Sequence, residues 1–308
     1  MTLTRSMLLR AADSPWLARQ MSERAFAKRA VRRFMPGESL DDALRAAQGL
    51  VANLLGSLLT ELGENLSTLE EAAQVRDDYL AIFHRIKAQG LPTWVSVKPT
   101  QLGLDLSMDA CREHLQALAH KAESTGSLLW IDMEDSSYVD RTLELYRAAR
   151  TRHPRVGLAI QAYLRRTPAD LDALLPLRPT IRLVKGAYAE PASLAFPMKR
   201  ETDLAYYALG RRLLEAAARG AAFPVFGTHD MLLVERLVGA AKELGVADRK
   251  YEIHMLYGIG TTNQRALASQ GRSVKTLISY GGAWFKWYMR RLAERPANVW
   301  FALRSMVG

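Results

Sequence analysis

The sequence has one cysteine, no long apolar run and no signal for export. Cys111 alone cannot form an internal disulfide, and a chain with a single thiol fits a reducing compartment. No stretch approaches the roughly 18 apolar residues that a membrane span needs. Residues 1–15 lack the apolar core and cleavage site of a secretory signal. We therefore expect a cytoplasmic protein.

Nucleic-acid motifs are also missing, although the net charge of +10 raises the question of such a partner. The arginines are interspersed with acids on helical stretches such as RTLELYRAARTRHPR. The sequence has no zinc-finger spacing, no RNP-like aromatic strand and no basic tail. We expect no nucleic-acid partner, and a basic interaction protein stays the alternative of a different class.

The basic charge is densest near the N-terminus. Residues 19–33 (RQMSERAFAKRAVRR) form a basic helical pattern, typical of a solvated outer helix or of a helix on an anionic membrane surface. Pro36-Gly37 then marks a boundary. We predict an N-terminal helical segment over 1–36 and one catalytic domain over 37–308, with a peripheral contact at the inner membrane face as a further hypothesis.

Beyond that boundary, short β-rich runs alternate with amphipathic helices such as SMDACREHLQALAHKAE and ETDLAYYALGRRLLEAAARG, which stops at Gly220. This alternation predicts a parallel sheet, and eight strands are the number that closes an α/β, (βα)8 TIM-like barrel. An open doubly wound sheet is the alternative, but no GxGxxG follows a strand. The predicted strands are Gly56–Leu62, Thr93–Lys98, Leu128–Met133, Val156–Tyr163, Ile181–Lys185, Pro224–Thr228, Tyr251–Leu256 and Lys275–Tyr280.

Polar side chains follow nearly every predicted strand, at the end where the loops of such a barrel converge. The lysines among them suit anionic partners, ion pairs with nearby carboxylates, or a Schiff base as in barrel aldolases. We expect no metal site, because no HxH or HExxH spacing links the histidines. The strand-end residues are Glu64, Lys98, Asp132, Glu134, Asp135, Gln161, Tyr163, Lys185, Tyr188, Thr228, His229, Asp230, His254, Leu256 and Tyr280.

The C-terminal stretch GGAWFKWYMRRLAERPANVW is the most distinctive part of the sequence. Large apolar side chains lead directly into Arg290 and Arg291. Planar guanidinium groups match a carboxylate bidentately, so the pair suits an acid ligand. An ordinary arginine pair on a solvated helix face is the alternative interpretation of this stretch.

A set of motifs runs through the chain in order: SVKPTQLGLDLS, WIDMED, AIQAYLRR, IRLVKGAY, AFPMKRETD, THD, EIHMLYGI and YGGAWFKWYMRRLAERPAN. With them the sequence resembles the proline dehydrogenase family, from about Phe34 to Val307. The combination of RLVKGAY with MRRLAERPAN is specific to that family. The resemblance implies a (βα)8 barrel that binds FAD.

The resemblance also implies roles for single residues. Arg290 and Arg291 would clamp the substrate carboxylate. Lys98 would lie beside the substrate and pair with Asp132, the acidic active-site residue. The other substrate-pocket residues would be Leu256 and Leu277, and the catalytic residues Asp132 and Arg182. Residues that match cofactor-binding positions are Met133, Gln161, Arg182, Lys185, Gly186, Ala187, Tyr188, Thr228, His229 and Glu294, of which Glu294 would also pair with an arginine of the clamp.

The implied reaction is hydride transfer from an amino acid to FAD. The amine must lose a proton before its lone pair can assist hydride departure, and the protein supplies position and electrostatics. The product from proline would be pyrroline-5-carboxylate, and a quinone would take the electrons onward. Gly186 fits this expectation, since a backbone that approaches a cofactor closely has no room for a side chain.

Four positions depart from the family pattern. Leu277 stands where members carry a pocket tyrosine, and Trp287 replaces a tyrosine three residues before Arg290. His254 replaces a glutamine, and Asp230 stands where many members have asparagine. Because Leu277 and Trp287 change the pocket, a different cyclic or modified amino acid, such as hydroxyproline or a biosynthetic intermediate, is the alternative substrate.

Overall fold

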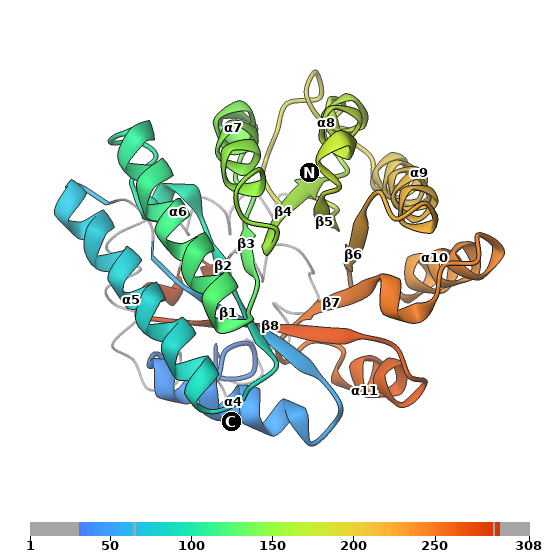
Figure 1. Cartoon of the computed structure of the whole chain (residues 1–308). Coiled ribbons are helices and arrows are strands. Elements are labelled where there is room, and N and C mark those ends of the chain that lie inside the picture. Colours follow the sequence, from blue (N-terminus) through green and yellow to red (C-terminus); the bar gives the residue numbers. More distant parts are fainter. Residues whose placement is uncertain (1–30, 64–65, 286, 290–308) are drawn as a thin grey trace.

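The computed structural model describes residues 31–63, 66–285 and 287–289. Its strands form a closed parallel barrel in which each strand pairs with the next and β8 pairs with β1 (Figure 1). This closure confirms the predicted (βα)8 barrel and rules out the open doubly wound sheet. The strands are β1 (Gly56–Glu61), β2 (Thr93–Val97), β3 (Leu129–Ile131), β4 (Val156–Gln161), β5 (Thr180–Val184), β6 (Phe223–Gly227), β7 (Glu252–Leu256) and β8 (Val274–Tyr280).

All eight predicted strands are confirmed, and their differences lie mainly at the C-terminal ends. The predicted third strand ends early at Ile131, although the N–H of Asp132 still donates to the carbonyl of Val97 at 2.8 Å. The predicted fourth strand ends at Gln161 because the chain then turns over residues 162–164. The strands thus end where the polar residues begin, which places those residues at one mouth of the barrel.

Helices form a ring around the strands (Figure 1). Their apolar faces repeat at helical spacing: in the second helix of the list below, Tyr79, Ile82, Phe83 and Ile86 are all buried. The α-helices are α4 (Leu40–Val51), α5 (Leu69–Ala88), α6 (Met108–Thr125), α7 (Val139–Arg150), α8 (Thr167–Leu174), α9 (Lys199–Ala218), α10 (Met231–Glu243) and α11 (Thr261–Ser269). The 3-10 helices are η1 (Pro99–Leu102), η2 (Ser136–Tyr138), η3 (Leu175–Leu177) and η4 (Asp248–Lys250).

Local sequence signals set the helix ends. Thr68 caps α5 in a capping box with Glu71, and the hydroxyl of Ser107 accepts from the N–H of Ala110 at the start of α6. Gly126 ends α6 in the left-handed conformation, with φ of 73°. Gly220, the predicted stop of α9, also has a positive φ and follows the cap residue Arg219.

The wall of the barrel between β8 and β1 is covered by α4, which precedes β1 in the chain. The segment after β8 packs elsewhere. Trp284, Phe285 and Tyr288 form a separate apolar cluster with Leu62, just beyond the end of β1, and with Val31, Phe34 and Met35. The chain after β8 therefore lies at the mouth of the barrel rather than on its outer wall.

The predicted N-terminal segment falls almost wholly outside the described residues. Residues 31–36 are described and contribute to the cluster around Trp284. The division at residue 36 stays a prediction. Within the described residues, no helix has the length and apolar character needed to cross a bilayer.

Candidate active site at the barrel mouth

An ion pair between the buried Arg182 and the half-buried Asp132 joins β5 to the end of β3 inside the barrel. Arg182 is only 4% exposed, and its guanidinium also donates to the Ser96 hydroxyl at 3.1 Å. Ser96 in turn donates to Asp132 at 2.8 Å. The three side chains from β2, β3 and β5 therefore hold one another in a closed triangle. Burial lowers the pKa of Arg182, and the charge of Asp132 opposes that shift.

The guanidinium of Arg182 also lies on an aromatic ring. Its Cζ atom is 4.8 Å from the ring centroid of Trp130, a cation–π geometry. Trp130 is fully buried and occupies the space left by Gly157 on the neighbouring strand β4, where a Cβ atom would lie 2.7 Å from the indole. A glycine is therefore required at position 157 for the ring to lie under Arg182.

The pairing of Lys98 with Asp132 is a prediction that the structure corrects. The cation that pairs with Asp132 is Arg182. Lys98 is half-buried just before η1, where its backbone N–H donates to the side chain of Gln101 at 3.3 Å. The physical reason is the shape of the cation. The planar guanidinium of Arg182 can donate to Asp132 and Ser96 together, which the single ammonium group of Lys98, in the turn before η1, does not match.

A second ionic cluster lies at the ends of β5 and β6. Lys185 donates to Asp203 at 2.5 Å and to Asp230 at 2.8 Å, and Lys199 contacts the same two carboxylates. Although burial alone would raise it, the hydrogen bond from Lys185 lowers the pKa of Asp230. Asp230 stands where many sequences of the resembled family have asparagine, and it thus adds a negative charge beside Lys185.

The loop after β5 passes close to the loop after β4. Gly186 has φ of 111°, and a Cβ atom on it would overlap the ring of Tyr163. This close approach of Tyr163 is enough by itself to require a glycine at position 186. In the same loop Ala187 is exposed and Tyr188 is half-buried. Glu190 then accepts from the backbone and hydroxyl of Ser136, which ties the loop to η2.

Gln161, at the end of β4, has an unsatisfied acceptor. Its amide nitrogen donates to the carbonyl of Glu134 at 3.1 Å, but its buried Oε1 accepts no hydrogen bond from the described residues. A buried polar atom without a partner costs free energy, so a ligand that donates a hydrogen bond here would be favoured. Met133 is buried beside the same strand end.

His229 and Leu256 connect the ends of β6 and β7. The N–H of Leu256 donates to His229 Nε2 at 2.9 Å, so the neutral ring carries its proton on Nδ1. Thr228 accepts from the N–H of Asp230 at 3.1 Å, which shapes the turn into α10. Leu256 and Leu277, the two predicted apolar pocket residues, are both half-buried, and their strands are neighbours in register.

Two residues of this site were not predicted from the sequence: Ser96, which bonds to Arg182 and Asp132, and Trp130, whose ring lies against Arg182. Ser96 and Trp130 each lie two residues before a strand-end residue that was predicted, Lys98 and Asp132 respectively. Side chains two apart on a strand share a face, so stepping back by two along each strand would have pointed to both.

Below this site, ionisable side chains lie inside the barrel. Glu252 and His254 on β7 are hydrogen-bonded at 3.1 Å, and Lys275 on β8 lies with its Nζ atom 4.0 Å from the ring centroid of Trp94. All three ionisable side chains are at most 9% exposed. Burial raises the pKa of Glu252 to about 7, and burial together with Arg182 and Lys275 lowers the pKa of His254. His254 is therefore neutral at physiological pH.

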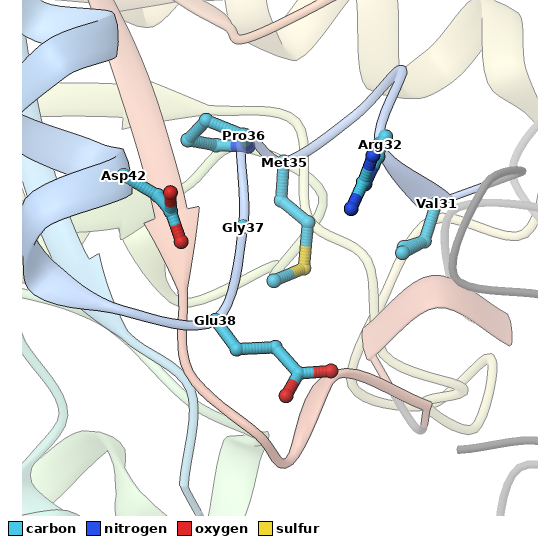
Figure 2. A pocket seen from close by; sticks show the side chains of 7 residues that line it. All are labelled: Val31, Arg32, Met35, Pro36, Gly37, Glu38 and Asp42. Atoms are coloured by element: carbon cyan, nitrogen blue, oxygen red, sulfur yellow. The ribbon is translucent and has the colours of Figure 1, made fainter. Parts of the chain in front are cut away.

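A pocket of about 440 Å³ lies apart from these strand-end residues. It is formed by residues 31–42, where the chain enters α4, and Figure 2 shows the lining side chains around it. It contains none of the predicted site residues. Three predicted residues, Arg290, Arg291 and Glu294, lie outside the described part of the chain, as does Glu64. Among the described residues no group of three His, Cys, Asp or Glu could hold a metal ion.

Comparisons with known proteins identify the family of this chain. The family model for proline dehydrogenase matches residues 43–304. Proline dehydrogenase 1 of Bacillus subtilis subsp. natto is 34% identical over 276 residues, 90% of each chain. The proline dehydrogenase of Deinococcus radiodurans is 32% identical over 280 residues, 89% of each chain. The chain belongs to the proline dehydrogenase family. It is accordingly an enzyme of the oxidoreductase class.

Solved structures match the fold. Proline utilization A of Bdellovibrio bacteriovorus, inactivated by N-propargylglycine, has a TM-score of 0.82 at 21% identity, over 95% of this chain and 36% of that one. A mutant of proline utilization A from Bradyrhizobium japonicum has a TM-score of 0.74 at 24% identity, over 91% of this chain and 32% of that one. The chain spans about a third of these larger proteins, and the likeness supports the barrel.

The buried carboxyl group of Glu252 makes stability depend on pH. Its pKa rises from 4.5 to about 7 on folding, so between these values the folded state binds more protons than the unfolded state. The free energy of unfolding should therefore fall as the pH rises from 4.5 through 7. Glu252→Gln should remove this fall, and the variant should gain on the wild type by up to about 3 kcal/mol by pH 8.

Urea unfolding at a series of pH values measures this difference. Glu113→Gln, at an exposed position of α6, is the matched control and should follow the wild type throughout. A constant offset between Glu252→Gln and the wild type at every pH would contradict the assignment.

Proposed function

We propose that this proline dehydrogenase family member oxidises L-proline to pyrroline-5-carboxylate, with FAD as the hydride acceptor. The observation that carries the proposal is the largely buried ion pair between Arg182, inside β5, and Asp132, at the end of β3, near the mouth where the family resemblance expects the active site. A buried ion pair is a costly way to stabilise a fold. Its position at the mouth favours a role in binding and catalysis.

The residues present fit an FAD molecule. Gln161 offers a buried acceptor that the described residues leave unsatisfied, and Lys185 supplies a cation beside the end of β5. Met133, Thr228, His229, Gly186, Ala187 and Tyr188 surround the same strand ends and would complete the cofactor-binding set. When bound, FAD supplies the two-electron oxidation that no protein side chain provides.

The chain's own residues would then position the substrate. Leu256 and Leu277 would offer an apolar wall to the ring carbons, and Lys98 would lie beside them. The proposed carboxylate clamp, Arg290 and Arg291, lies outside the described residues, as does Glu294, its proposed partner. Arg182, held by Asp132, would keep a fixed positive charge near the reacting atoms.

The absorption spectrum of the purified protein tests this function. We expect a yellow protein whose visible flavin band is bleached by L-proline without oxygen. Prolinamide is the matched control: it lacks the carboxylate, so it should bleach the band far more slowly. A protein that stays colourless after incubation with FAD would contradict the proposal. Binding of nucleic acid that weakens steeply with salt would instead support the basic interaction protein.

The pocket change at Leu277 makes a different cyclic or modified amino acid, such as hydroxyproline or a biosynthetic intermediate, the second candidate substrate. Leu277 packs against Leu58, Trp130 and Val225 and carries no hydroxyl. If proline is the substrate, Leu277→Tyr should leave kcat/KM for proline unchanged or raise it. If the pocket is shaped for another ligand, the same change should harm the native reaction while raising proline oxidation, by about 10- to 200-fold.

Steady-state kinetics with proline and a panel of cyclic amino acids separate these outcomes. Leu232→Tyr, at an exposed position of α10, is the control for the added tyrosine. A response of neither reaction to Leu277→Tyr would show that position 277 does not border the substrate.

We further propose a quinone as the onward electron acceptor and a peripheral contact with the inner membrane face, which the basic residues 19–33 would make. The family resemblance supports the quinone, and the charge pattern of the sequence supports the membrane contact. The full chain should co-migrate with anionic vesicles in flotation at low salt and should release at high salt. Absence from the vesicle fraction at low salt would contradict the proposed membrane contact.

A further inference from the structure

We propose that His254 is a positioning residue that fixes Arg182 at the site by supporting Trp130 from inside the barrel. The inference rests on the proposed function for its kinetic consequence only. The ring of His254 lies on β7 inside the barrel and contacts both tryptophans of the interior, Trp94 and Trp130. Its backbone carbonyl accepts from the N–H of the predicted site residue Thr228 at 3.2 Å.

Contacts link His254 to Arg182 through one ring. The imidazole meets Trp130 edge to face, with centroids 5.5 Å apart and an angle of 76°. Trp130 also lies against Gly157, where a Cβ atom would be 2.7 Å from the indole, and Arg182 lies over the ring at 4.8 Å. Trp130 is fully buried, so any movement of the imidazole must move the indole or open a cavity.

His254 is itself held in place. Its Nε2 is 3.1 Å from a carboxylate oxygen of Glu252, and its ring lies 5.9 Å from Trp94. Trp94 is in turn covered by the ammonium of Lys275, which occupies the space beside Gly56. These contacts run inside the barrel from Lys275, near the start of β8, through the half-buried Trp94 and His254 to Trp130 and Arg182, and Trp94 also contacts Trp130 directly, with ring centroids 6.2 Å apart.

To hold Trp130 in place, the imidazole of His254 must be neutral and hydrogen-bonded. The charged groups that face it are Glu252 on its own strand, Lys275 on β8 and Arg182 on β5. Two of these are cations, and with burial they keep the imidazole uncharged. His254 Nε2 is hydrogen-bonded to the carboxyl group of Glu252 at 3.1 Å, with the donor set by the tautomer of the ring. The hydrogen bond therefore sets the orientation of the aromatic contact.

The consequence is kinetic. A shift of about 1 Å in a positioned group can cost about 100-fold in rate, even when the mutated residue is remote from the chemistry. His254→Leu removes both the hydrogen bond to Glu252 and the ring edge, so Trp130 and Arg182 should shift. His254→Gln keeps a donor for Glu252 and should rescue most of the effect.

Kinetics of the flavin-loaded variants test the proposal. For His254→Leu we expect kcat for proline to fall by about 10- to 100-fold with little change in KM, because the substrate carboxylate would be held elsewhere. In an Arg182→Lys background the same change should have almost no further effect, since the two substitutions would disturb one interaction. His114→Leu is the matched control: His114 is also buried, but it lies on α6 and contacts the carbonyl of Leu102. It should leave kcat unchanged.

Crystal structures of the flavin-free wild type, His254→Leu and His254→Gln provide the second measurement. The distance from Arg182 Cζ to the Trp130 ring should lengthen in the leucine variant and stay near 4.8 Å in the glutamine variant. If His254→Leu does not fold, Gly157→Ala tests the link from Trp130 to Arg182 instead, because a Cβ atom there would lie 2.7 Å from the indole and displace it.

The outcomes are distinguishable. An unmoved Arg182 in the leucine variant, or kcat losses that add independently in the double variant, would overturn the role of His254. A wild type that never oxidises proline would overturn the proposed function instead, and the crystallographic distance would still decide the positioning claim.

Discussion

The burial of one charge, on Arg182, constrains the rest of this site. Taking a guanidinium out of water costs several kcal/mol unless it is paired and hydrogen-bonded. Here Asp132 supplies the opposite charge, Ser96 accepts a hydrogen bond, and Trp130 covers the remaining face. Each partner comes from β2 or β3, while Arg182 is on β5. Only a closed barrel brings these strands' inward faces together, so closure and charge compensation depend on each other.

The barrel interior below the site departs from the usual filling of branched aliphatic side chains. It holds two indoles, an imidazole, a carboxyl group and an ammonium group instead, and glycines at positions 56 and 157 leave the space for two of them. Such an interior has fewer ways to pack than an aliphatic one, because hydrogen bonds and ring contacts are directional. It therefore fixes the floor of the site more tightly, at the cost of burying ionisable groups.

Much of this could be predicted from the sequence. Eight strands and the mouth at their C-terminal ends followed from alternation and strand-end polarity, whereas the expected role of Gly186 came from the family resemblance. The partner of Asp132 did not, because pairing across a barrel depends on the register between strands, which the chain does not state locally. Glu252, Lys275 and Trp130 lie inside their strands and were missed as functional candidates, because polarity at the end of a strand does not by itself point to residues deeper in the barrel.

The path of the chain after β8 bears on how the mouth is completed. Since α4 already covers the wall between β8 and β1, the segment beginning at Trp284 is free to pack over the end of β1. There it buries Val31, Phe34 and Met35 from the other end of the chain, and the indole of Trp284 donates to Glu38 at 3.1 Å. Trp287–Met289 lead directly into the proposed carboxylate clamp. Because residues 31–35 and 284–289 share one apolar cluster, residues 31–38 stabilise the segment that precedes the proposed clamp. In the proposed function, substrate binding would therefore depend on residues that lie before the first strand of the barrel.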